Sequence, residues 1–509
     1  MNKKFYVTTA IVYANASPHI GFAYEVIAAD VIARYKRLAG YDVFFLTGSD
    51  EHSLNVERKA QSLGKTPKEY CDEMISVYKD VWKKLNISND DFIRTSDEKH
   101  KKCAQEIVQR VYEKGDIYKG HYEGWYCTSC EAYLPEKDLV DGNCSIHKQK
   151  PSWLKEENFF FALSKYTDKI LKHINDNPDF IQPDARKNEV LNVLKEGLTD
   201  ISISRSTFKW GIPFPLDESQ VVYVWFDALL NYISAIGYPD NKEKFNKYWP
   251  ADIHIIGKDI TRFHCLIWPA ILMALDLPLP KKIFGHGFLQ FKGEKMSKTR
   301  GNIVDPVEIS SEFGVDTLRY FLMREIPFGV DGDFSIDALI RRINNELAND
   351  LGNLVNRITG MLGKYCNFAV PEPNLEKDGL DTELYKKTEE VFAEVDNFME
   401  QFKFADALNK IWELIRMANQ YVDKTAPWKL FKANNVNRVN TVMYNSCETL
   451  RLISILLSPF MPNTSEKILL QFGFDKNYLN NKLDELKVWG KTQSGIKVLQ
   501  QEVLFPKIT

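Results

Sequence analysis

The chain has no long uninterrupted hydrophobic run. Along its 509 residues, no segment reaches eighteen consecutive apolar positions, whereas a transmembrane helix needs about twenty predominantly apolar residues. The first residues lead directly into a short patterned segment that runs into polar turn residues, without the apolar stretch of a signal peptide. We therefore expect a cytoplasmic protein with no membrane partner.

The chain also lacks a strong excess of either charge, and it has few cysteines. It carries 66 Lys and Arg against 69 Asp and Glu, a formal net charge of −3, so a polyanionic partner would have to bind at local basic patches. Of its 8 cysteines, Cys71, Cys103, Cys265 and Cys366 are scattered through patterned segments. This scatter favours buried free thiols in a reducing cytosol over a disulfide framework.

Residues 1–115 alternate between strand-like and helix-like segments. β-Branched and aromatic residues predict strands at 5–12, 42–48 and 91–95. Amphipathic patterns predict helices at 23–37, 53–63, 67–85 and 98–114. Such alternation is typical of a parallel sheet covered by helices, in which ligands bind at the carboxyl ends of the strands.

This alternation is interrupted and then returns. Residues 116–220 are rich in turn-forming residues and are predicted to be an insertion that splits the sheet. Strands are predicted again at 221–226, 253–257 and 282–287, with a helix at 227–235, and the pattern is almost wholly helical from 335 onward. We expect five segments: 1–115 and 221–290 forming the α/β sheet domain, the insertion 116–220, a loop region 291–345, and a helical domain 346–509.

A possible anion site lies where the first strand gives way to the first helix. His19 and Gly21 stand at this junction, where free backbone N–H groups and the positive end of the helix dipole collect. Gly21 would let a ligand approach the backbone, and His19 could donate a hydrogen bond to a phosphate oxygen. An ordinary turn with a solvated histidine is the alternative.

Two cysteine-containing knuckles predict a metal site. Cys127 and Cys130 are followed thirteen residues later by Cys144 and His147, a spacing that suits tetrahedral Zn²⁺. Four protein ligands leave no open position, so the metal would be structural and not catalytic. A disulfide pair or unrelated cysteines are the alternatives.

Two further clusters suit the chemistry of a charged ligand. Lys295 and Lys298 lie in a loop bounded by glycines, where they could stabilise charge that develops on a phosphate, although a solvated basic hairpin tip is the alternative. Asp50 follows the second strand, where a buried carboxylate suits a cation. Its alternative role is to cap the helix that begins near Ser53.

The motifs together resemble those of class I aminoacyl-tRNA synthetases. His19-Ile20-Gly21 and Lys295-Met296-Ser297-Lys298-Thr299 are similar to the two signature sequences of that class. Neighbouring motifs at 10–15, 48–52, 223–228, 256–260, 268–270 and 426–428 resemble the methionyl-tRNA synthetase family in order and spacing. The resemblance covers about residues 5–465. Within the family, the chain is similar to the bacterial type that has a single zinc knuckle.

The resemblance implies a Rossmann-like fold and a two-step reaction. Methionine and ATP, with Mg²⁺, would form methionyl-adenylate and pyrophosphate, and the methionyl group would pass to the 3′ end of tRNA(Met), initiator tRNA included. No covalent enzyme nucleophile is needed, so catalysis would rest on positioning and charge stabilisation. The insertion would hold the structural Zn²⁺, residues 291–345 would contact the tRNA stem, and residues 346–509 would bind the anticodon.

The resemblance also implies site residues at the matching positions. The ATP site would comprise His19, Gly21, Phe22, His286, Gly287, Lys295 and Lys298, of which His19, Lys295 and Lys298 would be catalytic. The methionine site would comprise Ile11, Tyr13, Asp50, Trp225, Ala228, Tyr232, Ile260 and His264. The anticodon would contact Asn349, Asn353, Arg357 and Trp428, and the Zn²⁺ ligands would be Cys127, Cys130, Cys144 and His147.

Several of these residues also have plainer interpretations. Without the resemblance, Trp225 and Tyr232 would be core residues at helical spacing. Asn349, Asn353 and Arg357 recur every four residues, so they would share one polar helix face. For methionine, shape alone rejects leucine by only about 1–3 kcal/mol, and our hypothesis is an added hydrogen bond to the sulfur from Tyr13 or His264.

Phe22 departs from the family pattern, which has a second histidine at this position. Phenylalanine cannot donate the hydrogen bond of that histidine, and a lost donor to a developing charge costs roughly 3 kcal/mol. The rival functions are a synthetase for cysteine, valine or leucine, an inactive paralogue that only binds RNA, and a metalloenzyme at the cysteine knuckle. We expect a monomer, because no appended dimerisation domain is recognisable after the helical region.

Overall fold

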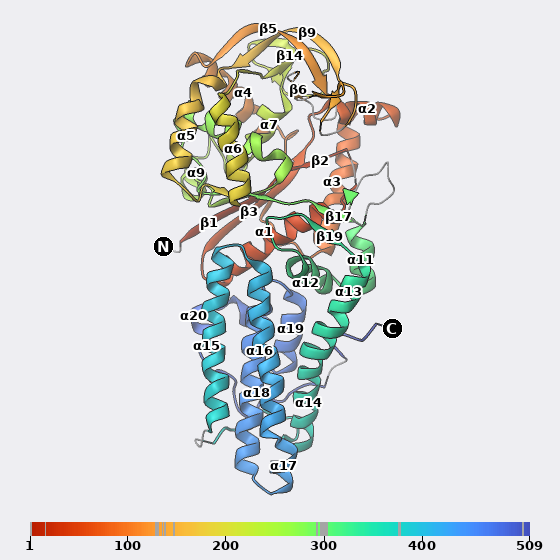
Figure 1. Ribbon diagram of the computed structural model, residues 1–509, viewed down its shortest axis with the longest axis vertical. Helices are drawn as coiled ribbons and strands as arrows, with labels where there is room; N and C mark the ends of the chain where they lie inside the picture. Colours follow the sequence, from red (N-terminus) through yellow and green to blue (C-terminus); the bar gives the residue numbers. More distant parts are fainter. Residues whose placement is uncertain are drawn as a thin grey trace. The chain divides into compact units, whose positions relative to one another are not determined.

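The computed structural model describes residues 3–15, 17–127, 132–134, 136, 139–145, 148–291, 294–295, 304–374, 378–500 and 503–508. The chain forms two compact units (Figure 1). The sheet unit comprises Lys4–Ala29 and Val43–His286, and the helical unit comprises Met1–Lys3, Asp30–Asp42 and Gly287–Thr509.

A seven-stranded sheet forms the centre of the sheet unit, as the alternation of strands and helices predicts. Its strand order is β10-β16-β15-β1-β3-β2, with β4 paired to β3. The β10–β16, β15–β16, β1–β15, β2–β3 and β3–β4 pairs are all parallel. These strands are β1 (Lys4–Thr9), β2 (Val12–Tyr13), β3 (Asp42–Asp50), β4 (Asp91–Arg94), β10 (Ile181–Gln182), β15 (Ile253–Gly257) and β16 (Ile283–His286).

Helices of the predicted type lie between the strands. They are α1 (Ile20–Leu38), α2 (Leu54–Ser62), α3 (Pro67–Lys84), α4 (Glu98–Glu113), α9 (Lys242–Tyr248) and α10 (Trp268–Ala274), with a π-helical turn at Phe263–Ile267. Local sequence fixes the start of α3, because Thr66 and Glu69 form a capping box and Pro67 takes the first helical position. Apolar residues of α4, α9, α10 and the sheet belong to one buried core, and those of α2 and α3 form a second, smaller one.

The segment between the two halves of the sheet is mainly antiparallel. Its longest pair joins β5 (Ile117–Cys127) to β9 (Ser152–Phe161), with β6 (Ala132–Leu134) and β11 (Ile201–Ser202) at the edges. The remaining elements are β7 (Leu139–Val140), β8 (Asn143–Cys144), α5 (Thr167–Asp176), α6 (Asp184–Glu196), β12 (Ser204–Arg205), β13 (Pro213–Phe214) and β14 (Asp217–Val222). Within this segment, β10 joins the main parallel sheet through β16.

The predicted strand at 221–226 is wrong. β14 ends at Val222 and pairs antiparallel with β12 and β13, and the helix α7 (Val224–Leu229) begins at once, followed by α8 (Asn231–Ser234). Every residue of α7 is buried. A short apolar run that is buried on all sides has no periodicity that separates a helix from a strand.

The helical unit is an array of long helices, as the pattern after 335 predicts. It contains α11 (Pro306–Phe313), α12 (Val315–Glu325), α13 (Ile336–Arg342), a π-helical stretch at Ile343–Gly352, α14 (Asn353–Cys366), α15 (Gly379–Glu400), α16 (Phe404–Thr425), α17 (Pro427–Lys432), α18 (Val436–Leu457), α19 (Pro462–Gln471) and α20 (Leu483–Leu486). A small sheet of β18 (Glu294–Lys295), β17 (Leu289–Phe291) and β19 (Gly332–Phe334) precedes α13. In the part of the chain that the structure describes, no helix combines the length and hydrophobicity needed to cross a membrane.

Candidate functional site

His19 lies immediately before α1, and its ring orientation is set locally. The backbone N–H of Gly21 donates to His19 Nδ1 at 3.1 Å, so the neutral ring carries its proton on Nε2. The ring of Phe22 packs against the His19 ring at 4.3 Å between centroids. A Cβ on Gly21 would lie 2.9 Å from the His19 ring, so glycine at this position preserves the geometry.

Asp50 ends β3 and is paired with Tyr13 of β2 in the parallel register. The backbone N–H of Ala14 donates to the carbonyl oxygen of Asp50 at 3.1 Å, and the Asp50 residue is only 3% exposed. The cap of α2 is Ser53, whose hydroxyl accepts from the N–H of Val56 at 3.1 Å. The structure therefore places Tyr13 and Asp50 together and excludes the helix-cap alternative for Asp50.

A buried His–Asp–His network lies directly behind this edge of the sheet. Asp227 accepts from His52 Nδ1 at 2.8 Å and from His100 Nε2 at 2.7 Å. Burial alone would raise the pKa of Asp227, but the two histidines hold that pKa below its ordinary value. The network links the end of β3 to α7, which carries Trp225. Sequence reasoning missed His100, because a histidine inside an amphipathic helix has no signal of its own.

The predicted methionine-site aromatics come together in the sheet unit. The rings of Tyr13 and Trp225 meet edge to face at 6.3 Å, and Trp225 stacks on Phe263 at 3.7 Å with an interplanar angle of 6°. Phe263 was not predicted, and only its place one residue before His264 could have indicated it. Ala228, Tyr232 and His264 are buried, and Ile11, Tyr13 and Ile260 are half-buried. Trp225 and Tyr232 also belong to the hydrophobic core, so the core interpretation is correct as far as packing goes.

Hydrogen-bond direction determines what His264 can offer a ligand. His264 Nδ1 lies 3.0 Å from the carbonyl oxygen of Ile260, and Nε2 lies 2.8 Å from the hydroxyl of Tyr232. Burial lowers the pKa of His264 to about 4, so the ring is neutral at neutral pH. A carbonyl only accepts, so Nδ1 carries the single proton and Nε2 accepts from Tyr232. This arrangement leaves no N–H on His264 for a thioether sulfur.

His286 ends β16 and contacts a buried carboxylate. Its Nε2 lies 2.9 Å from Glu25 Oε2, while Glu25 Oε1 accepts from the N–H of Ala10 at 3.0 Å. Burial raises the pKa of Glu25. Glu25, which sequence reasoning missed, thus connects α1, the end of β1 and the predicted adenine-site histidine.

The second signature lies largely outside the described residues. Lys298 is among the undescribed residues, and for Lys295 only the backbone is described, in β18, where it pairs with Gln290 of β17. Gly287 belongs to the helical unit and approaches a neighbouring backbone: a Cβ there would lie 2.1 Å from the carbonyl carbon of Val330.

The knuckle is described in part. Cys127 ends β5 and Cys144 ends β8, and both are buried at 2% and 1% exposure. Cys130 and His147 lie outside the described residues. Over the described ranges, no cluster of three or more His, Cys, Asp or Glu side chains is placed to hold a metal ion, and these ranges do not include two of the four predicted ligands.

The predicted anticodon residues lie in the helical unit. Asn349 belongs to the π-helical stretch. Asn353 is the first residue of α14, and Arg357 lies one turn further along that helix. Asn349 and Asn353 are exposed, and Arg357 contacts Asp423 of α16 at 2.5 Å. Trp428 lies on α17 with 36% of its surface exposed.

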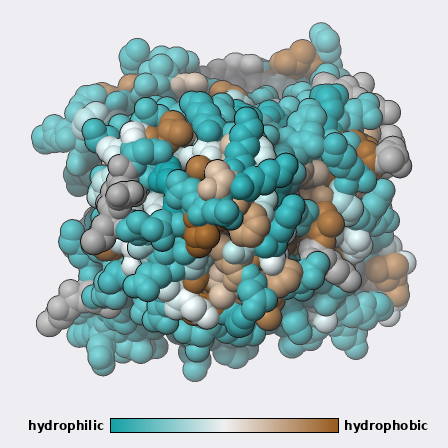
Figure 2. All heavy atoms as spheres, turned by 90° about the horizontal axis from the view of Figure 1, so that it is seen from below, coloured by the Kyte–Doolittle hydropathy of each residue, from teal (hydrophilic) through white to brown (hydrophobic). Residues whose placement is uncertain are grey.

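The end of the helical unit that carries α17 presents apolar side chains. Figure 2, which views the molecule from below, shows apolar side chains gathered within a mainly hydrophilic surface. Three large apolar residues at this end have at least a third of their surface exposed: Trp428 and Phe431 on α17, and Val436 at the start of α18. Lysines flank them on α17, at Lys429 and Lys432. Exposed rings beside cations suit the unpaired bases and phosphates of a nucleic acid loop.

Comparison with known proteins assigns the whole chain. The family described as class I tRNA synthetases (M) matches residues 5–146 and 136–359, and the anticodon-binding domain of methionyl-tRNA ligase matches residues 370–509. The methionine–tRNA ligase of Caldanaerobacter subterraneus subsp. tengcongensis is 51% identical over 510 residues, covering 100% of this chain and 79% of that protein. The methionine–tRNA ligase of Thermotoga maritima is 49% identical, covering 99% of this chain and 80% of that protein.

Solved structures agree with the sequence comparison. Mycobacterium tuberculosis methionyl-tRNA synthetase in complex with methionyl-adenylate has a TM-score of 0.95 at 43% identity, covering 99% of this chain and 100% of that one. Its apo form has a TM-score of 0.89 at 40% identity, covering 100% of this chain and 99% of that one. The α/β unit with its parallel sheet and the helical unit that follows are thus both features of one enzyme family, and the chain belongs to the methionyl-tRNA synthetases of class I.

Proposed function

We propose that this chain activates methionine with ATP and transfers the methionyl group to the 3′ end of tRNA(Met). The observation that supports this proposal most directly is the edge of the parallel sheet where Asp50 and Tyr13 pair across β3 and β2, beside the buried aromatic cluster of Trp225. A carboxylate and an aromatic box at the carboxyl end of a parallel sheet match an ammonium group and a thioether. The family assignment supplies the reaction class.

In this proposal, Asp50 binds the methionine ammonium, and the aromatic cluster encloses the thioether. Ile11, Tyr13, Trp225, Ala228, Tyr232, Ile260 and His264 form the remaining walls. Because His264 donates its only N–H to Ile260, Tyr13 is the side chain from which we propose a hydrogen bond to the sulfur. His264 instead orients the Tyr232 hydroxyl.

ATP binds in this proposal at the start of α1 and the end of β16. His19, with its proton on Nε2, donates to a phosphate oxygen, and Gly21 keeps the backbone accessible. The remaining proposed ATP-site residues are Phe22, His286, Gly287, Lys295 and Lys298, and Mg²⁺ accompanies the triphosphate. The two lysines act on the charge that develops when pyrophosphate leaves.

For tRNA, we propose that exposed residues of the π-helical stretch, α14 and α17 bind the anticodon, namely Asn349, Asn353, Arg357 and Trp428. Asparagine and arginine can hydrogen-bond base edges, and the Trp428 ring can stack on an unpaired base. Initiator tRNA is included among the substrates, and the enzyme acts as a monomer.

We further propose one structural Zn²⁺ bound by Cys127, Cys130, Cys144 and His147. The burial of the Cys127 and Cys144 side chains at the ends of β5 and β8 supports this donor set, because three thiolates and one imidazole are ligands that Zn²⁺ prefers. Metal analysis of the purified protein should find one zinc per chain, and Cys130→Ser should lose it. A zinc content unchanged by Cys130→Ser would contradict this site.

The experiment that tests the proposed function is methionine-dependent exchange of pyrophosphate into ATP, followed by aminoacylation of tRNA. We expect exchange with methionine and without tRNA, and no comparable exchange with cysteine, valine or leucine. Exchange with another amino acid would favour a different synthetase. Binding of tRNA without exchange for any amino acid would favour an inactive RNA-binding paralogue.

A further inference from the structure

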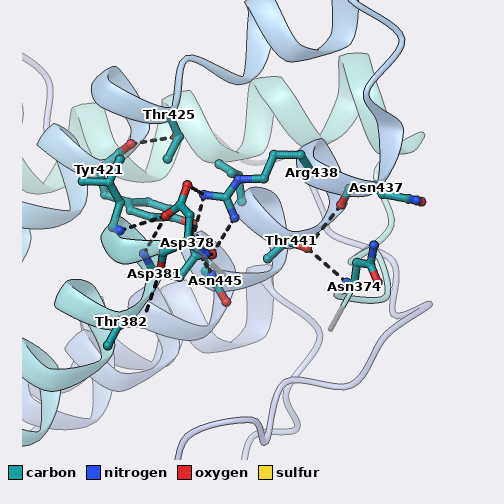
Figure 3. Close-up of polar contacts among 12 residues, drawn as sticks. Asn374, Asp378, Asp381, Thr382, Tyr421, Thr425, Asn437, Arg438, Thr441 and Asn445 are labelled. Atoms are coloured by element: carbon teal, nitrogen blue, oxygen red, sulfur yellow. Dashed lines mark hydrogen bonds and ion pairs between the residues drawn. The ribbon is translucent and has the colours of Figure 1, made fainter. Parts of the chain in front are cut away.

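A capping pair at the start of α15 reaches both helices that flank Trp428. Asp378 caps α15, and Asp381 is its third residue: the Asp381 N–H donates to Asp378 Oδ1 at 3.2 Å, and the Asp378 N–H donates to Asp381 Oδ2 at 3.0 Å. The Asp381 side chain is 3% exposed. Figure 3 shows that side chains from two other helices converge on this pair.

The first contact comes from the last turns of α16. The hydroxyl of Tyr421 donates to Asp381 Oδ1 at 2.5 Å, and the hydroxyl of Thr425 donates to the carbonyl oxygen of Tyr421 at 2.7 Å. α16 ends at Thr425, and Ala426 takes a left-handed conformation with φ of 43°. Asp381 thus holds the end of α16 just before the chain turns into α17.

The second contact comes from the first turns of α18. Arg438 donates from Nη1 to Asp381 Oδ2 and from Nη2 to Asp378 Oδ2, the latter at 2.6 Å. Asn445 Nδ2 donates to Asp381 Oδ1 and to the Tyr421 hydroxyl oxygen, both at 3.1 Å. One carboxylate therefore accepts hydrogen bonds from both helices between which α17 lies.

The charge on Asp381 strengthens these contacts. Burial alone would raise its pKa, but hydrogen bonds from Arg438, Tyr421 and the Asp378 backbone lower that pKa below its ordinary value. Asp381 is therefore ionised at neutral pH. Hydrogen bonds to an ionised group are about twice as strong as those between neutral groups.

The corner itself has little intrinsic rigidity. α17 spans only Pro427–Lys432, far below the length at which an isolated helix is stable. Trp428 on this helix is 36% exposed, so its direction depends on how the flanking helices are held. Phe431, which is 40% exposed, also packs on Tyr365 of α14 at 4.7 Å between ring centroids.

We propose that Asp381, Arg438 and Tyr421 form a clamp that fixes the corner between α16 and α18 and thereby positions Trp428 for the tRNA. The three residues are positioning residues, since none is assigned a contact with a base. This inference rests on the proposed role of Trp428 at the anticodon and extends it to residues that carry no family motif identified from the sequence.

The test measures the KM for tRNA in aminoacylation beside pyrophosphate exchange without tRNA. We expect Asp381→Asn to raise the KM for tRNA roughly tenfold, because it replaces charge-assisted hydrogen bonds by weaker neutral ones. Exchange without tRNA and kcat should be unchanged. Tyr421→Phe removes only the hydroxyl and should raise the same KM by a smaller factor.

A matched control separates positioning from general destabilisation. Glu448 is an equally buried carboxylate on α18, but it pairs with Arg451 and accepts from the N–H of Gly490 and of Thr492 in the C-terminal segment. Glu448→Gln should lower stability to unfolding and leave the KM for tRNA unchanged. An equal rise in KM for Glu448→Gln would overturn the clamp.

The double variant Asp381→Asn with Trp428→Ala decides whether the clamp acts through Trp428. If it does, the double variant should have the same KM for tRNA as Trp428→Ala alone. A KM raised by the product of the two single-variant factors would overturn the inference. If Trp428→Ala is itself silent, the proposed anticodon role fails. If Trp428→Ala raises the KM while Tyr421→Phe and Asp381→Asn do not, the clamp alone fails. If Asp381→Asn reduces exchange without tRNA, that variant is generally destabilised, and Tyr421→Phe becomes the test. A raised KM for tRNA in Tyr421→Phe would then support the clamp, and an unchanged KM would overturn it.

Discussion

At the scale of single residues, the direction of each hydrogen bond decides what a side chain offers to a ligand. His19 accepts from Gly21, so its proton is on Nε2. His264 donates to Ile260, so its proton is on Nδ1. Two histidines of the proposed active site thus have opposite tautomers. The sequence predicts both histidines, but it carries no information on the carbonyl or N–H that selects the tautomer.

Asp50→Asn tests the proposed ammonium site. The change keeps the shape and removes the charge, so kcat/KM for methionine in pyrophosphate exchange should fall about 100-fold, which is the ~2.7 kcal/mol expected for one partner of a buried charge pair. The control is Ser53→Ala, which removes the actual cap of α2 and should cost about 1 kcal/mol of stability. If Ser53→Ala lowered kcat/KM for methionine while Asp50→Asn did not, the assignment of Asp50 to the ammonium group would be wrong.

Phe22→His tests the one departure from the family pattern. Phe22 packs on His19 and lies edge to face with Tyr78 at 6.3 Å, and an imidazole of similar size fits the same packing. An added donor near the phosphates should raise the rate of adenylate formation at least tenfold, within the roughly 3 kcal/mol that one such donor supplies. Rapid-quench measurement of adenylate checks this. An unchanged rate would show that the backbone N–H groups of α1 and His19 already suffice.

At the scale of elements, long patterned helices and buried strands could be predicted, and short ones could not. The predicted positions of α1 to α4 agree with the structure, and α2 and α3 begin at side-chain caps. The run at 221–226 is apolar throughout, so only tertiary packing could show that α7 begins at Val224. Likewise, the even spacing of Asn349, Asn353 and Arg357 suggests one α-helical face, whereas Asn349 lies in a π-helical stretch, where each turn contains more residues.

Gly287→Ala tests how closely two elements of the helical unit must approach. Gly287 lies two residues before β17, which pairs parallel with β19, and an added Cβ would lie 2.1 Å from the Val330 carbonyl carbon and 2.4 Å from the Asp331 nitrogen. Both atoms belong to the backbone, so the strands must separate, and we expect a stability loss of about 3 kcal/mol or more. Denaturant unfolding measures it.

Gly360→Ala is the control for this substitution. Gly360 lies within α14 with no atom inside 4 Å of an added Cβ, so alanine should be neutral or should stabilise by up to about 1 kcal/mol. Equal losses for both variants would show that the close approach at Gly287 does not matter.

At the scale of the whole molecule, the family and the fold class, an α/β parallel sheet followed by a helical domain, could be predicted, because ordered motifs are spread along the chain. The interactions that support those motifs could not. His100, Glu25, Phe263 and the Asp381 network occupy ordinary positions in helical patterns. Only the folded chain brings the first three against motif or predicted site residues, and the Asp381 network against the helices that flank α17. Sequence motifs record contacts with a ligand more clearly than contacts between helices.

Acid should destabilise the sheet unit. The pKa of His264 is about 4 in the folded chain and about 6.5 in an unfolded one, so the unfolded state binds the extra proton between these values. Stability therefore falls as pH falls from 7 to 4, by about 3 kcal/mol from His264 alone. The lowered pKa of His254 acts in the same direction, whereas the lowered pKa of Asp227 adds a loss of stability only below about pH 4. Urea unfolding at pH 7 and pH 4 should show a smaller difference for His264→Gln than for the parent chain.

Buried thiols can report local opening of the chain, and the predicted burial is correct for Cys71, Cys103 and Cys265 but wrong for Cys366, which is only half-buried. Cys103 and Cys265 lie in the sheet unit and Cys447 in the helical unit, each at most 2% exposed, and burial raises the pKa of all three thiols. A thiol reagent can modify such a group only when the surrounding structure opens. Mass spectrometry of the modified positions over time would therefore report the opening rate of each unit separately, in the native enzyme and without any introduced label.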